Sequence, residues 1–322
     1  MLLFSFFVIL ISGCSNEINL YKTGESVPIV YCLLNPGNDL QYVRLGKSFL
    51  ASGEIDIADI KADSLSWQYV PDVYLERWKN EDPVEVIIFE PADIHTRDTG
   101  LFPTGGLKLY TADLQPKPGE EYHLYVYFPD INKIISGETI IMDIPEVIDP
   151  VYVPGRTISF DTISPLNIRW TAGKQAGLYQ GAFKMNYSET LNDDFAISTC
   201  LFSTGLYYKQ TPDDIYQEAI NGNNFFQAIG SLMKPQAGVS REILNFEFIF
   251  YSSGPELAIL VGSDLGISNP FALIRNSSNI TGGMGIFSSY TVQRVPNLQP
   301  SNTTKYFMAT SQHTKHLGFK DE

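Results

Sequence analysis

The chain has 322 residues, and its 22 Lys and Arg side chains are outnumbered by 36 Asp and Glu side chains, which gives a net charge of −14 at neutral pH. This acidity argues against nucleic acid as a partner, because phosphate binding requires a basic surface. The hydrophobic fraction of 44% and the charged fraction of 18% are typical of a folded chain. At about 150 residues per domain, the length predicts two domains.

The N-terminus carries the strongest local signal. Nine of the ten residues from 2 to 11 are apolar, and Ser12, Gly13 and Cys14 follow them. An apolar run of this length that ends in small residues is typical of a signal peptide and is too short to span a bilayer. The first five positions depart from the usual pattern, because they contain no Lys or Arg.

The tetrad at residues 11–14, Ile-Ser-Gly-Cys, resembles a bacterial lipobox. The resemblance implies that residues 1–13 are a lipoprotein signal peptide and that Cys14 is the lipidated first residue of a tether over residues 14–26. Two or three acyl chains hold a protein on a membrane far more firmly than one. We therefore expect a lipid anchor at the outer membrane, on the cell surface or the periplasmic face. Ser15 favours outer-membrane sorting, because it replaces the Asp that retains some lipoproteins at the inner membrane.

Period-two alternation predicts strands along the first half of the chain, and turn-forming residues separate them. Short strands at this spacing predict an immunoglobulin-like β-sandwich over residues 27–144. The turn at 114–122 resembles the one before a late strand of such domains, where a tyrosine anchors the corner. The predicted strands lie at residues 27–34, 73–78, 84–89 and 122–128.

Three prolines between residues 142 and 155 mark a boundary, after which residues 145–322 are predicted to form a second β-rich domain. Strands are expected near 157–160, 166–170 and 246–251. A helical insertion is expected at about 211–233, with one helix capped by Thr211 and another beginning near Asn223. The fold class predicted for the whole chain is mainly β, with two β-sandwich domains.

Two cysteines remain once Cys14 is acylated, and the compartment would allow them to pair. Cys32 and Cys200 lie in different predicted domains, each within an apolar strand pattern. The two cysteines could form a disulfide or remain as free thiols, and two buried free thiols are favoured.

The chain shows no motif for nucleophilic or metal-dependent catalysis. Gly282, Gly283 and Gly285 lack the spacing and the lysine of a phosphate loop, and they predict a tight turn. His313 and His316 could face one metal ion but have few ligands nearby, and His123 is isolated on a strand. The acidic group Asp56, Asp59 and Asp63 lacks the loop that wraps calcium. No cofactor, metal site or catalytic residue is therefore predicted.

Aromatic side chains make up 13% of the chain, including 18 tyrosines. Tyrosine and tryptophan bury large areas at interfaces and stack on sugars. The strand predicted at 122–128 is aromatic on both faces. It could present a binding face or be covered by β layers on both sides.

Several segments spread over the mature chain share one resemblance: residues 14–20, 30–36, 42–45, 118–122, 166–170 and 279–289. Through them the chain resembles a family of Bacteroidetes outer-membrane lipoproteins whose domain has no established activity. The resemblance implies an all-β envelope protein related to the machinery around TonB-dependent receptors, and it supplies no catalytic residues.

The function predicted from these observations is that of a non-enzymatic, lipid-anchored binding or assembly module at the outer membrane. The expected partner is a TonB-dependent receptor or another envelope protein. The alternatives are a glycan-binding lipoprotein of a nutrient-uptake system, a structural subunit of a surface fibre, and a hydrolase. Fold class alone does not separate these roles.

Overall fold

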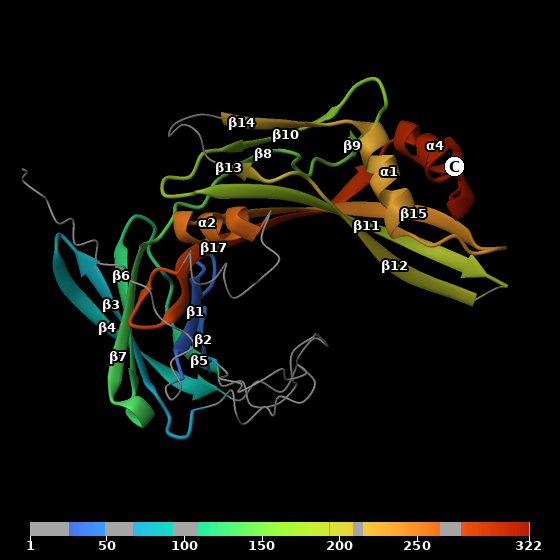
Figure 1. Ribbon diagram of the computed structural model, residues 1–322. Coiled ribbons are helices and arrows are strands. Elements are labelled where there is room, and N and C mark those ends of the chain that lie inside the picture. Colours follow the sequence, from blue (N-terminus) through green and yellow to red (C-terminus); the bar gives the residue numbers. More distant parts are fainter. Residues whose placement is uncertain are drawn as a thin grey trace, which may run out of the picture.

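The computed structural model is mainly β, as the sequence predicts (Figure 1). Cys14 and the group Asp56, Asp59 and Asp63 lie outside the described residues. Within the described ranges, no helix is long and apolar enough to cross a membrane. The structure describes residues 26–48, 67–92, 109–192, 194–208, 215–264 and 278–321.

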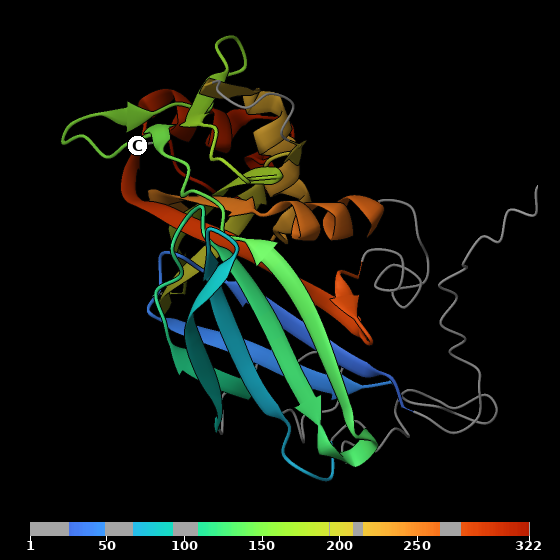
Figure 2. The ribbon, with the colours of Figure 1, turned by 90° about the vertical axis from the view of Figure 1, so that its left-hand side faces the viewer.

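The first half of the chain forms two packed layers of strands, in a sandwich-like arrangement (Figures 1 and 2). β4 pairs with β5 only through Glu90–Ala92, so the sheet folds over from one layer into the other. One layer contains β1 (Pro28–Leu34), β2 (Leu40–Lys47) and β5 (Leu109–Asp113). The other contains, in order of pairing, β4 (Asp82–Ala92), β3 (Asp72–Lys79), β6 (Glu121–Phe128) and β7 (Lys133–Ile140).

Strand β6 shows how the alternating sequence builds this core. Tyr122, Leu124 and the following inward side chains are buried, whereas the side chains between them are half-buried on the opposite face. The Tyr122 hydroxyl accepts a hydrogen bond from the Lys117 backbone N–H at 3.1 Å, so this tyrosine anchors the preceding turn. One face of β6 therefore lies in the core and the other points outward.

Strand β17 (Met284–Pro300) connects the two halves of the molecule (Figure 2). Its first residues pair in parallel with β1, and the remainder pairs in antiparallel with β15 (Ser240–Ser253). The short strand β16 (Ile280–Thr281) precedes it and pairs with β7. Ile280 and Phe287 consequently lie in the same hydrophobic core as the strands of the first half.

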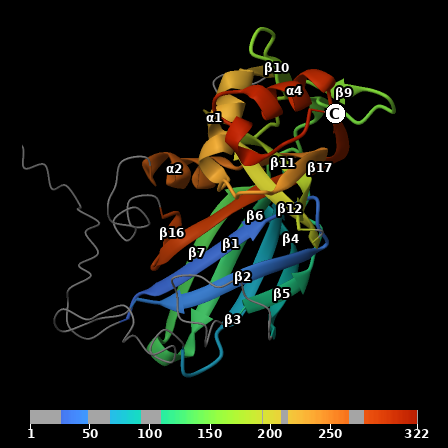
Figure 3. The same cartoon turned by 90° about the vertical axis from the view of Figure 1, so that its right-hand side faces the viewer.

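The second half is built on a sheet of long strands covered by helices and a small sheet (Figure 3). The long strands β12 (Asp194–Ser203) and β11 (Leu178–Leu191) continue the sheet beyond β15, with β13 (Tyr207–Tyr208) and β9 (Thr157–Ile158) at its margins. The small sheet contains β14 (Ile215–Ile220), β10 (Leu166–Thr171) and β8 (Val147–Asp149). The helices are α1 (Gly222–Leu232), α2 (Pro255–Asp264) and α4 (Asn302–Thr310), with 3-10 turns η3 (Pro129–Ile131) and η4 (Lys315–Leu317).

Helix α1 confirms one part of the predicted helical insertion and corrects another. Asn221 caps the helix by accepting a hydrogen bond from the Asn223 N–H. Phe225 of this helix stacks on Phe160, with ring centroids 3.8 Å apart. The helix predicted to follow Thr211 is wrong over residues 215–220, which form β14 instead. Pairing along the whole of β10 outweighs the local helix signals there.

Cys32 and Cys200 are free and buried, in agreement with the favoured alternative. Cys32 lies in the core of the first half and Cys200 in the core of the second half. Each therefore serves as a small apolar side chain.

The glycine cluster forms the predicted tight turn, between β16 and β17. Gly282 has a φ of 79°, a left-handed conformation that favours glycine. Gly285 has a φ of 129°, and a Cβ built on it would lie 1.8 Å from the carbonyl oxygen of Val30. The close approach of β17 to β1 therefore requires glycine at this position.

We predict that Gly285→Ala lowers the free energy of unfolding by about 2–4 kcal/mol, because backbone strain and a steric clash act together. Denaturant titration measures this change. The matched control is Gly46→Ala on β2, where the nearest atom to a new Cβ is 4.0 Å away. Equal stability of the two variants would contradict the close approach of the strands.

Candidate functional site

The side of the β4–β3–β6–β7 layer that points away from the core carries an unusual set of side chains. We call this surface the outer face. The register of the strands places its residues in rows across the sheet. Its members are Asp72, Tyr74, Glu76 and Trp78 of β3; Val86 and Ile88 of β4; Glu121, His123, Tyr125 and Tyr127 of β6; and Ile134, Ser136, Glu138 and Ile140 of β7.

Two stacked pairs of rings occupy the centre of the outer face. Tyr74 stacks on Tyr125 with centroids 5.1 Å apart, and Trp78 stacks on His123 with centroids 4.6 Å apart. The Trp78 indole N–H donates a hydrogen bond to the Glu76 carboxylate at 3.1 Å. Cross-strand packing thus holds these rings in fixed orientations.

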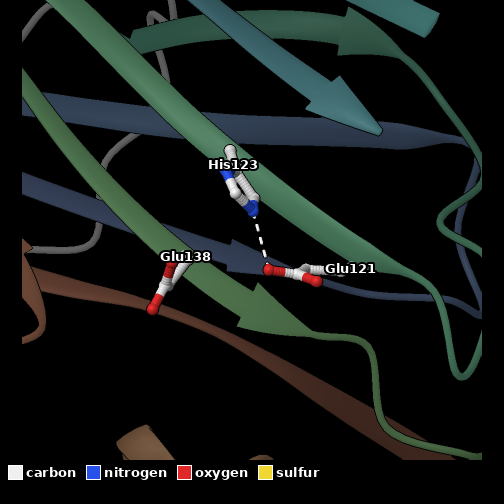
Figure 4. A group of neighbouring side chains, drawn as sticks. All are labelled: Glu121, His123 and Glu138. Atoms are coloured by element: carbon white, nitrogen blue, oxygen red, sulfur yellow. Dashed lines mark hydrogen bonds and ion pairs between the residues drawn. The ribbon is translucent and has the colours of Figure 1, made fainter. Parts of the chain in front are cut away.

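Three potential metal ligands, Glu121, His123 and Glu138, lie close together on this face (Figure 4). One of them, His123, is the residue that stacks on Trp78. His123 Nε2 lies 2.7 Å from a Glu121 carboxylate oxygen, and Glu138 lies directly across from His123 on β7. One donor atom from each residue lies within 4.8 Å of the other two. Within the described ranges, this is the one group of three His, Cys, Asp or Glu side chains that meets this distance.

The outer face is acidic. Its strand positions include Glu76, Glu121 and Glu138 but no lysine or arginine. Burial raises the pKa of Tyr125, and the nearby Glu76 and Glu138 carboxylates raise it further. Carboxylates on both neighbouring strands therefore act on the Tyr125 hydroxyl.

Exposed aliphatic side chains flank the central rings. On β4, Val86 is 60% exposed and Ile88 is 66% exposed, and on β7 Ile134 is 61% exposed. In the described part of the chain, residues Asp82 to Phe89 of β4 pair with β3 alone. This part of β4 is therefore an edge strand, with one side of its backbone unpaired. An exposed apolar strand of this kind is typical of an interaction surface.

The other residues considered from the sequence do not form a comparable group. His313 and His316 lie near the C-terminus, and the His313 ring contacts Gln312. Gly282, Gly283 and Gly285 serve the turn already described. Cys14 lies outside the described residues, so its lipidation stays a prediction.

The sequence pattern alone made His123 look isolated, whereas the structure places Glu121 and Glu138 beside it. Glu121 and His123 are two residues apart on a strand, so period-two alternation already places them on one face. Glu138 could have been found from the hairpin after Phe128, because the pairing of Phe128 with Lys133 sets Glu138 opposite His123. That step requires the strand register, which the alternation pattern alone does not give.

A partly buried carboxylate belongs to the small sheet of the second half. Glu218 of β14 is half-buried, and one of its carboxylate oxygens has no hydrogen-bond partner in the part of the chain that the structure describes. Burial raises the pKa of Glu218, although hydrogen bonds from Thr204 and Gly205 act in the opposite direction. Burial and the Glu218 carboxylate raise the pKa of Tyr207, whose ring packs edge-on against the buried Trp170, so this carboxylate lies beside the core of the second half.

No protein-family model matches the chain, and a search of curated proteins finds no similar sequence.

We predict that Glu218→Gln raises the free energy of unfolding at pH 7. An acid whose pKa is raised by folding destabilises the folded state when it is charged, and this penalty disappears below its ordinary pKa of 4.5. Denaturant titrations at pH 7 and at about pH 4 should show a stabilised variant only at the higher pH.

Glu242→Gln is the matched control, because Glu242 is exposed on β15. A Glu218→Gln variant that is less stable than the wild type at pH 7 would contradict the assigned burial penalty.

Proposed function

We propose that this protein is a non-enzymatic, lipid-anchored envelope protein that binds a partner protein through the outer face. The observation that carries the proposal is the combination of stacked rings with exposed Val86, Ile88 and Ile134 on one sheet surface. The solvent side of an antiparallel sheet is usually polar. Large exposed apolar surfaces with aromatic centres are typical of protein interfaces.

The ring geometry favours a protein partner over a glycan. Sugars stack on the open face of an aromatic ring. On the outer face, Tyr74 and Tyr125 press their faces together, as do Trp78 and His123. The flanking aliphatic side chains on β4 and β7 add apolar area that suits side chains better than hydroxyl-rich sugars.

The charge of the outer face indicates the chemistry of the partner. Glu76, Glu121 and Glu138 would attract a surface that combines lysine or arginine with apolar residues. The N-terminal resemblance to outer-membrane lipoproteins supports a partner in the same membrane, such as a TonB-dependent receptor. A lipid anchor at Cys14 would hold the two proteins at one surface and raise their effective concentration.

We predict that Cys14→Ser moves the protein from the membrane fraction to the soluble fraction, because the acylated sulfur is lost. Fractionation of native cells with immunodetection measures this change. Cys32→Ser is the control, since Cys32 is buried in the first core and carries no anchor. Membrane association that survives Cys14→Ser would contradict lipid anchoring.

We predict that the double substitution Val86→Lys and Ile88→Lys abolishes binding of the partner. Two positive charges placed on the apolar edge would repel a basic surface and prevent its dehydration. We expect at least about a tenfold loss of recovery. The measurement is affinity isolation of the lipidated protein from native membranes, followed by quantitative mass spectrometry.

The matched control is Phe195→Lys with Ile197→Lys on β12, where both side chains are 65% exposed but lie in the other half of the molecule. Support requires one identified outer-membrane protein in a near-stoichiometric ratio, recovered by the wild type and the control but not by the β4 variant. Recovery that is equal for all three proteins would contradict the assignment of the outer face. A shift on glycan-containing native gels that the β4 variant loses would favour the glycan-binding alternative.

A further inference from the structure

Two adjacent strands bring an imidazole and two carboxylates together on the outer face. Glu121 and His123 alternate along β6, and Glu138 faces His123 from β7 (Figure 4). Because all three side chains project from paired strands, their backbone positions are fixed by the ladder of hydrogen bonds. Sites on strands are held more precisely than sites on loops.

The charge of this group is not balanced by the protein. Glu121 pairs with His123, whose imidazole carries at most one positive charge. In the described part of the chain, no lysine or arginine forms an ion pair with Glu121, Glu138 or Glu76. A bound cation would offset this excess of negative charge, and a divalent ion would do so most effectively.

The surroundings of His123 orient its ring. Trp78 lies flat against it, with an interplanar angle of 15°, and Trp78 is in turn held by its hydrogen bond to Glu76. Groups that support a ligand in this way lower the cost of arranging it around a metal. The group is therefore partly organised before any ion binds.

We propose that Glu121, His123 and Glu138 form a binding site for a divalent transition-metal ion of the zinc type. One nitrogen and two carboxylate oxygens are a donor set that zinc accepts, and three protein ligands leave one coordination position open. Calcium requires six to eight oxygen ligands, and magnesium demands near-octahedral oxygen geometry. The imidazole therefore favours zinc over both of these ions.

Binding requires a small rearrangement of the side chains. Ligand atoms about 2.1 Å from a tetrahedral zinc ion lie about 3.4 Å from one another. His123 Nε2 and the Glu121 oxygen, now 2.7 Å apart, would separate slightly, and Glu138 would approach from within 4.8 Å. Nε2 binds a metal ion through its lone pair, so a proton on that nitrogen moves to Nδ1 or to solvent when the ion binds.

The experiment is a calorimetric titration of the purified full chain with Zn²⁺, after removal of bound metal by a chelator. We expect one ion per chain at micromolar affinity, with a change in tryptophan fluorescence because Trp78 contacts His123. His123→Gln and Glu138→Gln should each weaken binding by at least about tenfold. Thermal unfolding of each variant without metal verifies that the fold is retained.

His313→Gln and Glu242→Gln are the matched controls, since each removes the same type of group from another part of the chain. Both should bind Zn²⁺ as the wild type does. No saturable binding, or unchanged affinity in a folded His123→Gln variant, would overturn the proposal. The titration contains no partner protein, so its result is independent of the proposed function.

Discussion

Strand β17 hydrogen-bonds to β1 over its first residues and to β15 over the remainder, so one stretch of backbone belongs to both hydrophobic cores. The change of partner occurs at fully buried Ser288 and Ser289. The Ser289 hydroxyl accepts a hydrogen bond from the Met142 N–H at 3.1 Å, and its carbonyl accepts one from Gly254 at 2.7 Å. Because an unpaired buried polar group costs about 1–3 kcal/mol, these contacts fix how the two halves meet.

Because β17 serves the two cores, binding is left to the outward surfaces of the two sandwich layers. These two surfaces differ in charge. On the outward side of the β1–β2 layer, the Arg44 guanidinium lies 5.8 Å from the centre of the Tyr31 ring. The outer face of the other layer has stacked rings as well, but its strand positions carry carboxylates and His123 and no lysine or arginine. A basic partner and a metal cation are therefore both directed to the same side of the sandwich.

Sequence patterns predicted the elements whose conformation is determined by residues close by in the chain. Alternation located β1, β3, β4, β6 and β15, and Asn223 with the aromatic pair Phe225 and Phe226 indicated α1, whose cap in the structure is Asn221. The sharing of β17 could not be predicted, because residues near 30 pair with residues near 285, and no short-range pattern encodes that contact. The error at β14 has the same origin, since pairing with β10 decided its conformation. Glu138 joins His123 only once the register of β6 and β7 is known.

The candidate site is therefore a consequence of the core beneath it. His123 points outward because Tyr122 and Leu124 are buried on either side of it along β6. Glu138 faces it because Ile135 and Thr139 are buried on the inner side of β7. A slip of one residue in this pairing would move every outward side chain to the inner face. The free energy that excludes such a slip is the burial of the alternating apolar residues, at about 25 cal/mol per Å² of apolar surface. The same burial that stabilises the sandwich thus sets the ligand positions, and no loop is needed to hold them.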